Sequence, residues 1–290
     1  MLREIKYPLY GVTATDVNNL EQIAQSLERF DFMPTTRIVF DEWEPATNYE
    51  WAVSEIHKVS YVMGELLDSQ YVGQYSVEQY RARTAEYLNL LGDRVDIWEI
   101  GNEVNGHWVR KKEKTDRPDP PGVIDAESKL VIDKISAAYE VIKADPKRRV
   151  ALTLYFNDDG HGQHCWVNKE DEMFTWARKH IPQQIKDNLD FVLVSYYEDD
   201  CKNFNIDWQK VFDELAGTFK HAKIGFGESG TKNKGKKKEF IDRYYRMKIN
   251  HPNYVGGYFW WYFKQDMVPY TKKVNGVRLW DVLNKAAQGL

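Results

Sequence analysis

Cysteine is scarce in this chain, which has only Cys165 and Cys201 among its 290 residues. Two cysteines are too few for the disulfide framework of a small secreted domain, and neither has the spacing of zinc ligands. We expect both to be ordinary buried or half-buried thiols rather than a bridge. A chain of this length can instead bury a large hydrophobic core.

Long apolar runs are also missing. No segment approaches the roughly 18–20 apolar residues that a membrane helix needs. Three of the first six residues are charged, and the segment lacks the apolar stretch of a signal peptide. We therefore expect a soluble protein with no membrane partner. The sequence does not indicate its compartment, and secretion with later removal of a signal peptide is one of the alternatives.

Positive charge is not in excess. The chain has 40 Lys and Arg against 44 Asp and Glu, so its formal net charge is −4. That balance gives no reason to expect nucleic acid as a partner. One basic run, Lys232–Lys238, looks like a nucleic-acid patch, but we interpret it as the solvated start of a helix.

Short apolar runs, in contrast, recur eight times. Each is continuous and rich in Val, Ile, Leu and aromatic residues, as expected for strands that are covered on both faces. The predicted strands are Leu9–Thr13, Arg37–Phe40, Val59–Met63, Asp96–Ile100, Val150–Leu154, Phe191–Ser195, Lys223–Gly227 and Val255–Trp260.

Segments with helical periodicity lie between these strands. Ser76 is a good N-cap for one of them, and the Asp145-Pro146 pair ends another. The predicted helices are Val17–Phe30, Ser76–Leu91, Glu127–Ala144, Glu172–His180, Trp208–Phe219, Lys238–Asn250 and Leu279–Ala287.

Alternating strands and helices predict an α/β fold with a parallel sheet. Eight units in about this length favour closure into a (β/α)₈ TIM barrel, and we expect residues 1–290 to form one catalytic domain of this kind. A doubly wound open sheet is the alternative. It would normally carry a Gly-rich phosphate turn after its first strand, and Tyr10–Thr13 contains no such turn.

Two of the predicted strands end in glutamates. The fourth runs into Asn102-Glu103, and the seventh runs into Glu228. In a barrel, catalytic groups come from the carboxyl ends of strands, and strands four and seven lie on opposite sides. Hydrolysis of a glycosidic bond needs two carboxyl groups, one to protonate the leaving oxygen and one to attack the anomeric carbon or activate water.

This arrangement resembles clan A, the 4/7 superfamily of retaining glycoside hydrolases, which includes cellulases, β-mannanases, xylanases and β-glycosidases. The resemblance covers the whole chain in order. It implies a β-linked oligo- or polysaccharide substrate, a double displacement and no cofactor. Glu103 would be the acid/base and Glu228 the nucleophile.

The resemblance also implies roles for neighbouring residues. Asn102 would hold the sugar 2-hydroxyl, Arg37 and either Tyr196 or Tyr197 would orient Glu228, and Trp260 would stack under the scissile sugar. The alternatives are a buried structural ion pair for Arg37 and barrel packing for Trp260. Strand six lacks the His-x-Tyr often seen in family 5, and Val104 stands where Pro is usual, so the exact family is not assigned.

Other aromatic residues near the strand ends are candidates for sugar stacking. Aromatics make up 14% of the chain, and sugars present apolar C–H faces to aromatic rings. We predict substrate contacts for Trp43, Trp108 and Tyr155. The long loops after strands four, five and eight fit either an exo-acting pocket or an endo-acting cleft, and either hydrolysis or transglycosylation.

Two other functions compete with the glycosidase. A non-catalytic carbohydrate-binding barrel would keep the aromatics but lose a carboxylate, and both glutamates are present. A metal-dependent barrel hydrolase would need His and Asp ligands at strand ends. The loop with His161, His164 and Cys165, near Asp158, is a candidate, but it has no partner cluster. We therefore predict no metal and expect this loop to line a substrate subsite.

Overall fold

The computed structural model describes residues 3–110, 123–158, 165, 169–200 and 205–289. In these residues the strands form a closed barrel in the order β1 to β8, with every neighbouring pair parallel. The strands are β1 Leu9–Ala14, β2 Thr35–Val39, β3 Tyr61–Glu65, β4 Ile97–Gly101, β5 Val150–Tyr155, β6 Phe191–Tyr196, β7 Lys223–Ser229 and β8 Gly256–Trp260. The predicted (β/α)₈ barrel is confirmed, and each strand lies within two residues of its predicted ends.

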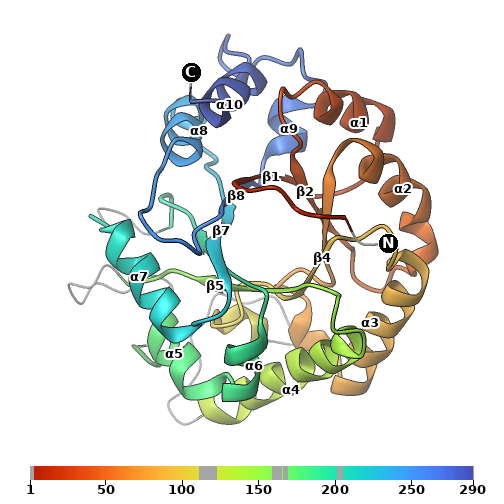
Figure 1. The fold of residues 1–290 in the computed structure, drawn as a ribbon, viewed down its shortest axis with the longest axis vertical. Helices are drawn as coiled ribbons and strands as arrows, with labels where there is room; N and C mark the ends of the chain where they lie inside the picture. Colours follow the sequence, from red (N-terminus) through yellow and green to blue (C-terminus); the bar gives the residue numbers. More distant parts are fainter. Residues whose placement is uncertain (1–2, 111–122, 159–164, 166–168, 201–204, 290) are drawn as a thin grey trace.

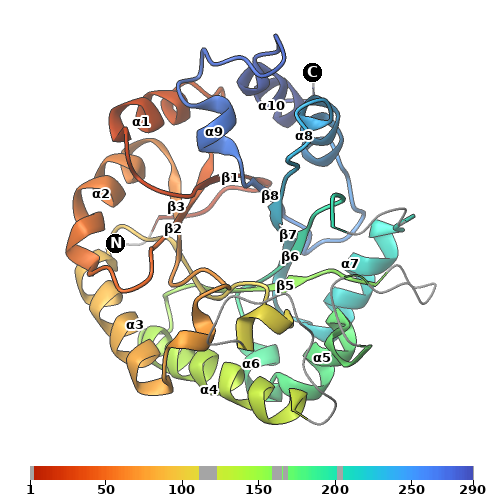
Figure 2. The same ribbon diagram turned by 180° about the vertical axis from the view of Figure 1, so that it is seen from behind.

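Helices surround the barrel as a ring, and Figures 1 and 2 show α1 to α5 and then α7 and α8 following one another around it, with α6 between α4 and α5. Their bounds are α1 Leu20–Glu28, α2 Glu50–Val59, α3 Val77–Leu91, α4 Ile124–Lys143, α5 Met173–His180, α6 Gln183–Asn188, α7 Trp208–Thr218, α8 Lys237–Tyr245, α9 Phe263–Met267 and α10 Leu279–Ala287. The sequence does not predict α2, α6 and α9. The helices α6 and α9 are too short for periodicity to reveal, and Val59, which we expect to open β3, is the last residue of α2.

The start of α3 agrees with the prediction. The Ser76 hydroxyl accepts a hydrogen bond from the Gln79 amide N–H at 3.1 Å, and the Gln79 side chain accepts one from the Ser76 N–H at 2.8 Å. This reciprocal capping box satisfies two N–H groups at the helix terminus. It also fixes the end of the loop after β3, which contributes to the cavity described below.

The barrel interior has an apolar layer at its amino-terminal end. Its members include Met63, Ile97, Ala151 and Leu193, which are buried together in one cluster. Because successive strand residues point to opposite faces, the residues two positions further on also face inward. Those residues are the polar Glu65, Glu99, Thr153 and Ser195, all buried. Polar side chains therefore fill the carboxyl end of the barrel, directly below the face where barrel enzymes bind substrate.

An irregularity in β7 turns Glu228 toward this interior. Ile224 and Phe226 pack in the outer core, between the sheet and the helices, so strict alternation would also point Glu228 outward. The pairing of β6 with β7 shifts between Val194–Phe226 and Ser195–Glu228, which leaves Gly227 as an extra residue. A bulge of this kind re-aims the side chains that follow it. Glu228 consequently meets Arg37 inside the barrel.

Candidate active site

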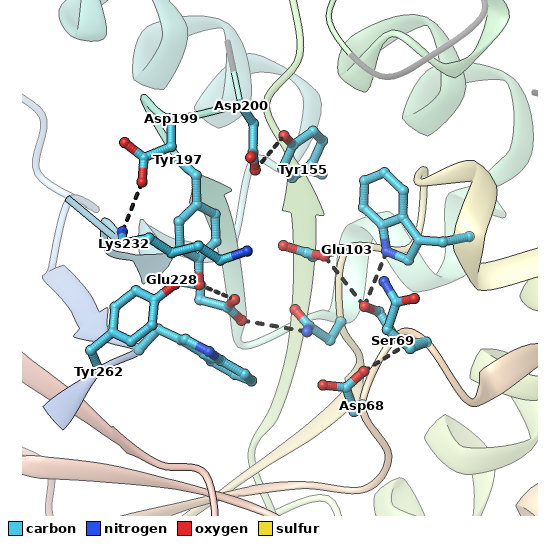
Figure 3. Close-up of a pocket in the computed structure, with 14 residues that line it drawn as sticks. Asp68, Ser69, Glu103, Tyr155, Tyr197, Asp199, Asp200, Glu228, Lys232 and Tyr262 are labelled. Carbon is cyan, nitrogen blue, oxygen red and sulfur yellow. Dashed lines mark hydrogen bonds between the residues drawn. The ribbon is translucent and has the colours of Figure 1, made fainter. Parts of the chain in front are cut away.

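A cavity of about 420 Å³ opens at the carboxyl ends of the strands. Glu103, just past β4, and Glu228, in β7, project into it from opposite sides (Figure 3). Residues from the ends of β3, β4, β5, β6, β7 and β8 form its walls. They are Asp68, Ser69, Gln70, Asn102, Glu103, Trp108, Tyr155, Tyr197, Asp199, Asp200, Glu228, Lys232, Trp261 and Tyr262.

Arg37 is fully buried in β2 and, within the described part of the chain, pairs with three carboxylates. Its guanidinium nitrogens lie 2.6 Å from Glu99, 2.5 Å from Glu228 and 3.1 Å from Glu65. Burial raises the pKa of Glu65 and of Glu99, and the Arg37 charge counteracts this. A buried charge must be paired to be tolerated. Arg37 is therefore the counter-ion for these three carboxylates.

Glu228 accepts hydrogen bonds from several donors at the cavity. Arg37 donates at 2.5 Å, the Asn102 amide donates at 3.5 Å, and the Tyr197 hydroxyl donates to the other carboxylate oxygen. These donors, one of them a cation, fix the orientation of the Glu228 carboxylate.

Glu103 has a different environment. Its carboxyl accepts from the Ser195 hydroxyl at 2.6 Å and from Ser69 at 3.3 Å, and Ser69 in turn accepts from the Trp108 indole at 3.1 Å. Burial raises the pKa of Glu103 well above its ordinary value, and the negative charge of Glu228 raises it further. Glu103 is therefore suited to carry a proton near neutral pH, while Glu228 faces a cation and two hydrogen-bond donors.

The backbone at Glu103 is unusual as well. Its φ of 50° lies in the left-handed region, where residues other than glycine are uncommon. A hydrogen bond from the Gly106 N–H to the Glu103 carbonyl oxygen, at 2.7 Å, closes the following turn. Conformations of this kind cluster at functional sites, where the surrounding structure compensates for their cost.

The structure brings most of the predicted site residues together. Arg37 and Asn102 contact Glu228, while Trp108 and Tyr155 line the cavity. Of the two tyrosines left open, Tyr197 donates to Glu228. Tyr196 packs outside the barrel against Phe156 and Trp208. The reason is alternation, since Leu193 and Ser195 face inward and Tyr197 continues their row.

Trp260 does not take the stacking position expected for it. Its side chain is fully buried in the outer core, and its indole N–H donates to Asp266 at 3.0 Å. Phe259 faces the barrel interior, so Trp260 faces out and Trp261 faces in, where it lines the cavity. The prediction for Trp260 is wrong because six consecutive aromatic residues, Tyr258 to Phe263, show no alternation of polar and apolar side chains that would indicate which of them face inward.

Trp43 also lies away from the cavity. It is 55% exposed, in the loop after β2, and stacks on Tyr75. Conversely, the sequence does not single out Asp68, Gln70 and Tyr262, which line the cavity. They follow the carboxyl ends of β3 and β8, and this position is the only signal that could have indicated them.

The basic run 232–238 is not simply solvated. Lys232 lines the cavity, and its side chain reaches toward the middle of it (Figure 3). Lys237 is buried and ion-paired with Asp266 at 2.7 Å. The interpretation of this run as a solvated helix start is therefore wrong at these two positions.

Cys165 is disulfide-bonded, so the expectation of a free thiol is wrong for this residue. Cys201, His161 and His164 lie outside the described residues. Within the described ranges, no group of three or more His, Cys, Asp or Glu side chains could hold a metal ion. None of the described helices is long and apolar enough to cross a bilayer.

The fold and site define the chain as a (β/α)₈ barrel with two carboxyl groups in contrasting environments. No protein-family description and no curated protein matches the sequence. Among solved structures it is similar to Saccharomyces cerevisiae Gas2p in complex with laminaripentaose, with a TM-score of 0.59 and 12% identity over 97% of this chain and 65% of that one. It is also similar to Bacteroides uniformis β-glucuronidase 2 covalently bound to cyclophellitol-6-carboxylate aziridine, with a TM-score of 0.59 and 13% identity over 88% of this chain and 30% of that one.

The chain thus spans less than two thirds of the length of Gas2p and under a third of the glucuronidase. A further Gas2 complex, with a compound numbered 8, gives a TM-score of 0.61 at 13% identity and 63% coverage of that chain. At such identities the likeness shows a shared barrel fold. The chemistry must be argued from this chain's own residues.

Proposed function

We propose that this protein is a retaining glycoside hydrolase that cleaves a β-linked glycan, with Glu103 as acid/base and Glu228 as nucleophile. One observation carries the proposal: two carboxyl groups face a common cavity from the ends of β4 and β7, one in a proton-retaining environment and one in an anion-stabilising environment. Glycosidases use a pair of carboxyl groups in different environments, so that one keeps its proton and acts as the acid while the other stays ionised and acts as the nucleophile.

The first step forms a covalent intermediate. The Glu228 carboxylate attacks the anomeric carbon, while the Glu103 carboxyl gives its proton to the departing glycosidic oxygen. Arg37 and Tyr197 hold the attacking carboxylate, and the Asn102 amide, which also contacts Glu228, binds the sugar 2-hydroxyl. One C–O bond forms and one breaks, and the leaving chain departs as an alcohol.

The second step reverses the proton transfer. Once Glu228 is an ester, it no longer carries the negative charge that raises the pKa of Glu103. Glu103, now ionised and with a lower pKa, removes a proton from water as the oxygen attacks the anomeric carbon. If a sugar hydroxyl takes the place of water, the same step is a transglycosylation. Two inversions give net retention.

The solved structures support a carbohydrate ligand for this barrel. Gas2p is seen with laminaripentaose, and the glucuronidase is seen covalently bound to an aziridine. The direct test is to incubate the protein with aryl β-glycosides and β-glycans and to follow the first-formed anomer by ¹H NMR. Initial release of the β-anomer supports the proposal. Initial release of the α-anomer would make Glu228 a general base in an inverting enzyme, and binding without turnover would favour a carbohydrate-binding barrel.

Glu103 gives a pH-dependent prediction. Because its pKa is higher in the folded state, the native protein binds more protons than the unfolded chain, and stability falls as pH rises from about 4.3, the ordinary glutamate pKa, to the folded value. We expect Glu103→Gln to be inactive on unactivated glycans yet more stable than wild type, by on the order of 1 kcal/mol at pH 8. The gain should shrink toward pH 4.

Urea unfolding of both proteins across this pH range measures the difference. Glu4→Gln is the matched control, because Glu4 is exposed and its replacement should leave the pH profile unchanged. A Glu103→Gln variant that is less stable than wild type at every pH would contradict the assigned environment of Glu103.

A further inference from the structure

Trp43 is the centre of an exposed aromatic platform. Its ring is stacked on that of Tyr75, with centroids 4.1 Å apart and planes 10° from parallel. Tyr75 is buried, whereas Trp43 is 55% exposed. One face of the indole is therefore covered by Tyr75, and the other face is open to solvent.

The platform is built rigidly. Trp43 has a φ of 61°, in the left-handed region, and its backbone N–H donates to the Tyr75 hydroxyl at 2.6 Å. Tyr75 contacts the buried Arg83, whose guanidinium carbon lies 5.9 Å from its ring centre. Arg83 also donates to backbone carbonyls of both adjoining loops: Phe40, Asp41 and Glu44 after β2, and Leu66 after β3. A ring fixed in this way loses little conformational entropy when a ligand stacks on it.

One continuous loop, after β3, joins the cavity wall to Tyr75, the buried half of the platform. Asp68, Ser69 and Gln70, just after β3, line the cavity. Tyr71 comes next and is hydrogen-bonded to Glu42, the neighbour of Trp43. Hydrogen bonds from Tyr71 N–H to Asp68 and from Tyr75 N–H to Val72 continue the turns as far as Tyr75. The loop that forms this side of the cavity wall therefore continues to Tyr75, on which Trp43 stacks.

The charged residues near Trp43 and the loop after β3 favour an uncharged ligand. Glu42, Glu44 and Asp68 are partly or fully exposed, whereas Arg83 is buried. A polyanionic chain would be repelled here, but neutral sugars can donate hydroxyl protons to carboxylates and stack their C–H faces on an indole.

We propose that Trp43 and Tyr75 form a distal sugar subsite, and that the substrate is an uncharged β-glycan chain running from the cavity over the loop after β3. This inference rests on the proposed function and deepens it. A subsite outside the cavity favours chain-cleaving action, since binding of a remote sugar contributes only when the substrate is long enough to reach it.

The test compares chain lengths. In Trp43→Ala we expect kcat/KM for long neutral oligosaccharides to fall about tenfold, mainly through KM, while aryl β-monosides react as in wild type. Trp51→Ala is the matched control. Trp51 is 70% exposed on α2 and is not part of the Trp43–Tyr75 platform. Its loss should leave kcat/KM for both substrates unchanged. Trp43→Gly removes the same ring without backbone strain, since glycine adopts a positive φ readily, and should reproduce the loss.

The outcomes separate this inference from the proposed function. Equal losses of kcat/KM on aryl β-monosides and on long chains would mean that Trp43 has a structural role, and would overturn the subsite. An unchanged kcat/KM on both substrates would overturn it as well. If wild type hydrolyses nothing, calorimetric titration with the neutral oligosaccharide still tests the platform: weaker binding by Trp43→Ala supports it while the hydrolase proposal fails. Equal binding of a polyuronic chain of the same length would overturn the choice of an uncharged ligand.

Discussion

Replacing Glu228 by alanine is expected to lower kcat/KM for aryl β-glycosides by about 10⁴-fold or more, because no covalent intermediate can form without the nucleophile. The Glu228 side chain ends in a pocket of donors, from Arg37, Tyr197 and Asn102, that remains when the carboxylate is removed. A small anion can occupy that space. Azide should therefore restore turnover and yield an α-glycosyl azide.

The variant Glu103→Ala should respond differently. General acid catalysis contributes about 10²–10⁴-fold, so the loss should be large for glycans and small for aryl glycosides with good leaving groups. Azide should then attack the glycosyl-enzyme and give a β-glycosyl azide. Together the two product configurations, read by NMR, assign both roles.

Glu198→Ala is the control for these variants. Glu198 lies after β6 on the same face of the barrel, but it pairs with Arg243 at 2.7 Å rather than lining the cavity. Near-normal turnover is expected for it. Undiminished activity in Glu228→Ala would eliminate the proposed mechanism and direct attention to the other carboxylates of the cavity wall, Asp68, Asp199 and Asp200.

Arg37→Met is expected to reduce the free energy of unfolding by about 3–5 kcal/mol, the usual cost of leaving a buried charge without its partner. Glu65, Glu99 and Glu228 would share the barrel interior with no cation between them. Thr153, which donates to Glu99, offers a hydrogen bond but no charge. Urea or thermal unfolding at neutral pH measures the loss.

Two comparisons make this prediction specific. Arg81→Met breaks an ion pair with Glu140 whose side chains are 48% and 62% exposed, and should cost no more than about 1 kcal/mol. Adding Glu65→Gln to Arg37→Met should recover part of the stability, because it removes one of the unpaired charges. An Arg37→Met protein as stable as the Arg81→Met control would show that the carboxylates are neutral without Arg37.

Much of the fold could be predicted because strand and helix signals are local. The eight strands are continuous apolar runs, and α3 and α10 begin and end within one residue of prediction. The sequence does not predict the helix α2, because its last residue, Val59, lies next to the apolar run of β3 and is assigned to that strand.

The site residues also differ in how far the sequence could predict them. The sequence by itself determined which residue types stand at the strand ends, and thus that Glu103 and Glu228 belong to the mouth of a barrel. Only the tertiary structure decided which side chains face inward, because that choice depends on strand register. The β7 bulge brings Glu228 to Arg37, and alternation selects Tyr197 over Tyr196 and Trp261 over Trp260. A shift of one residue reverses the face of a strand, and nothing in a run of aromatic residues records which face closure of the barrel will bury.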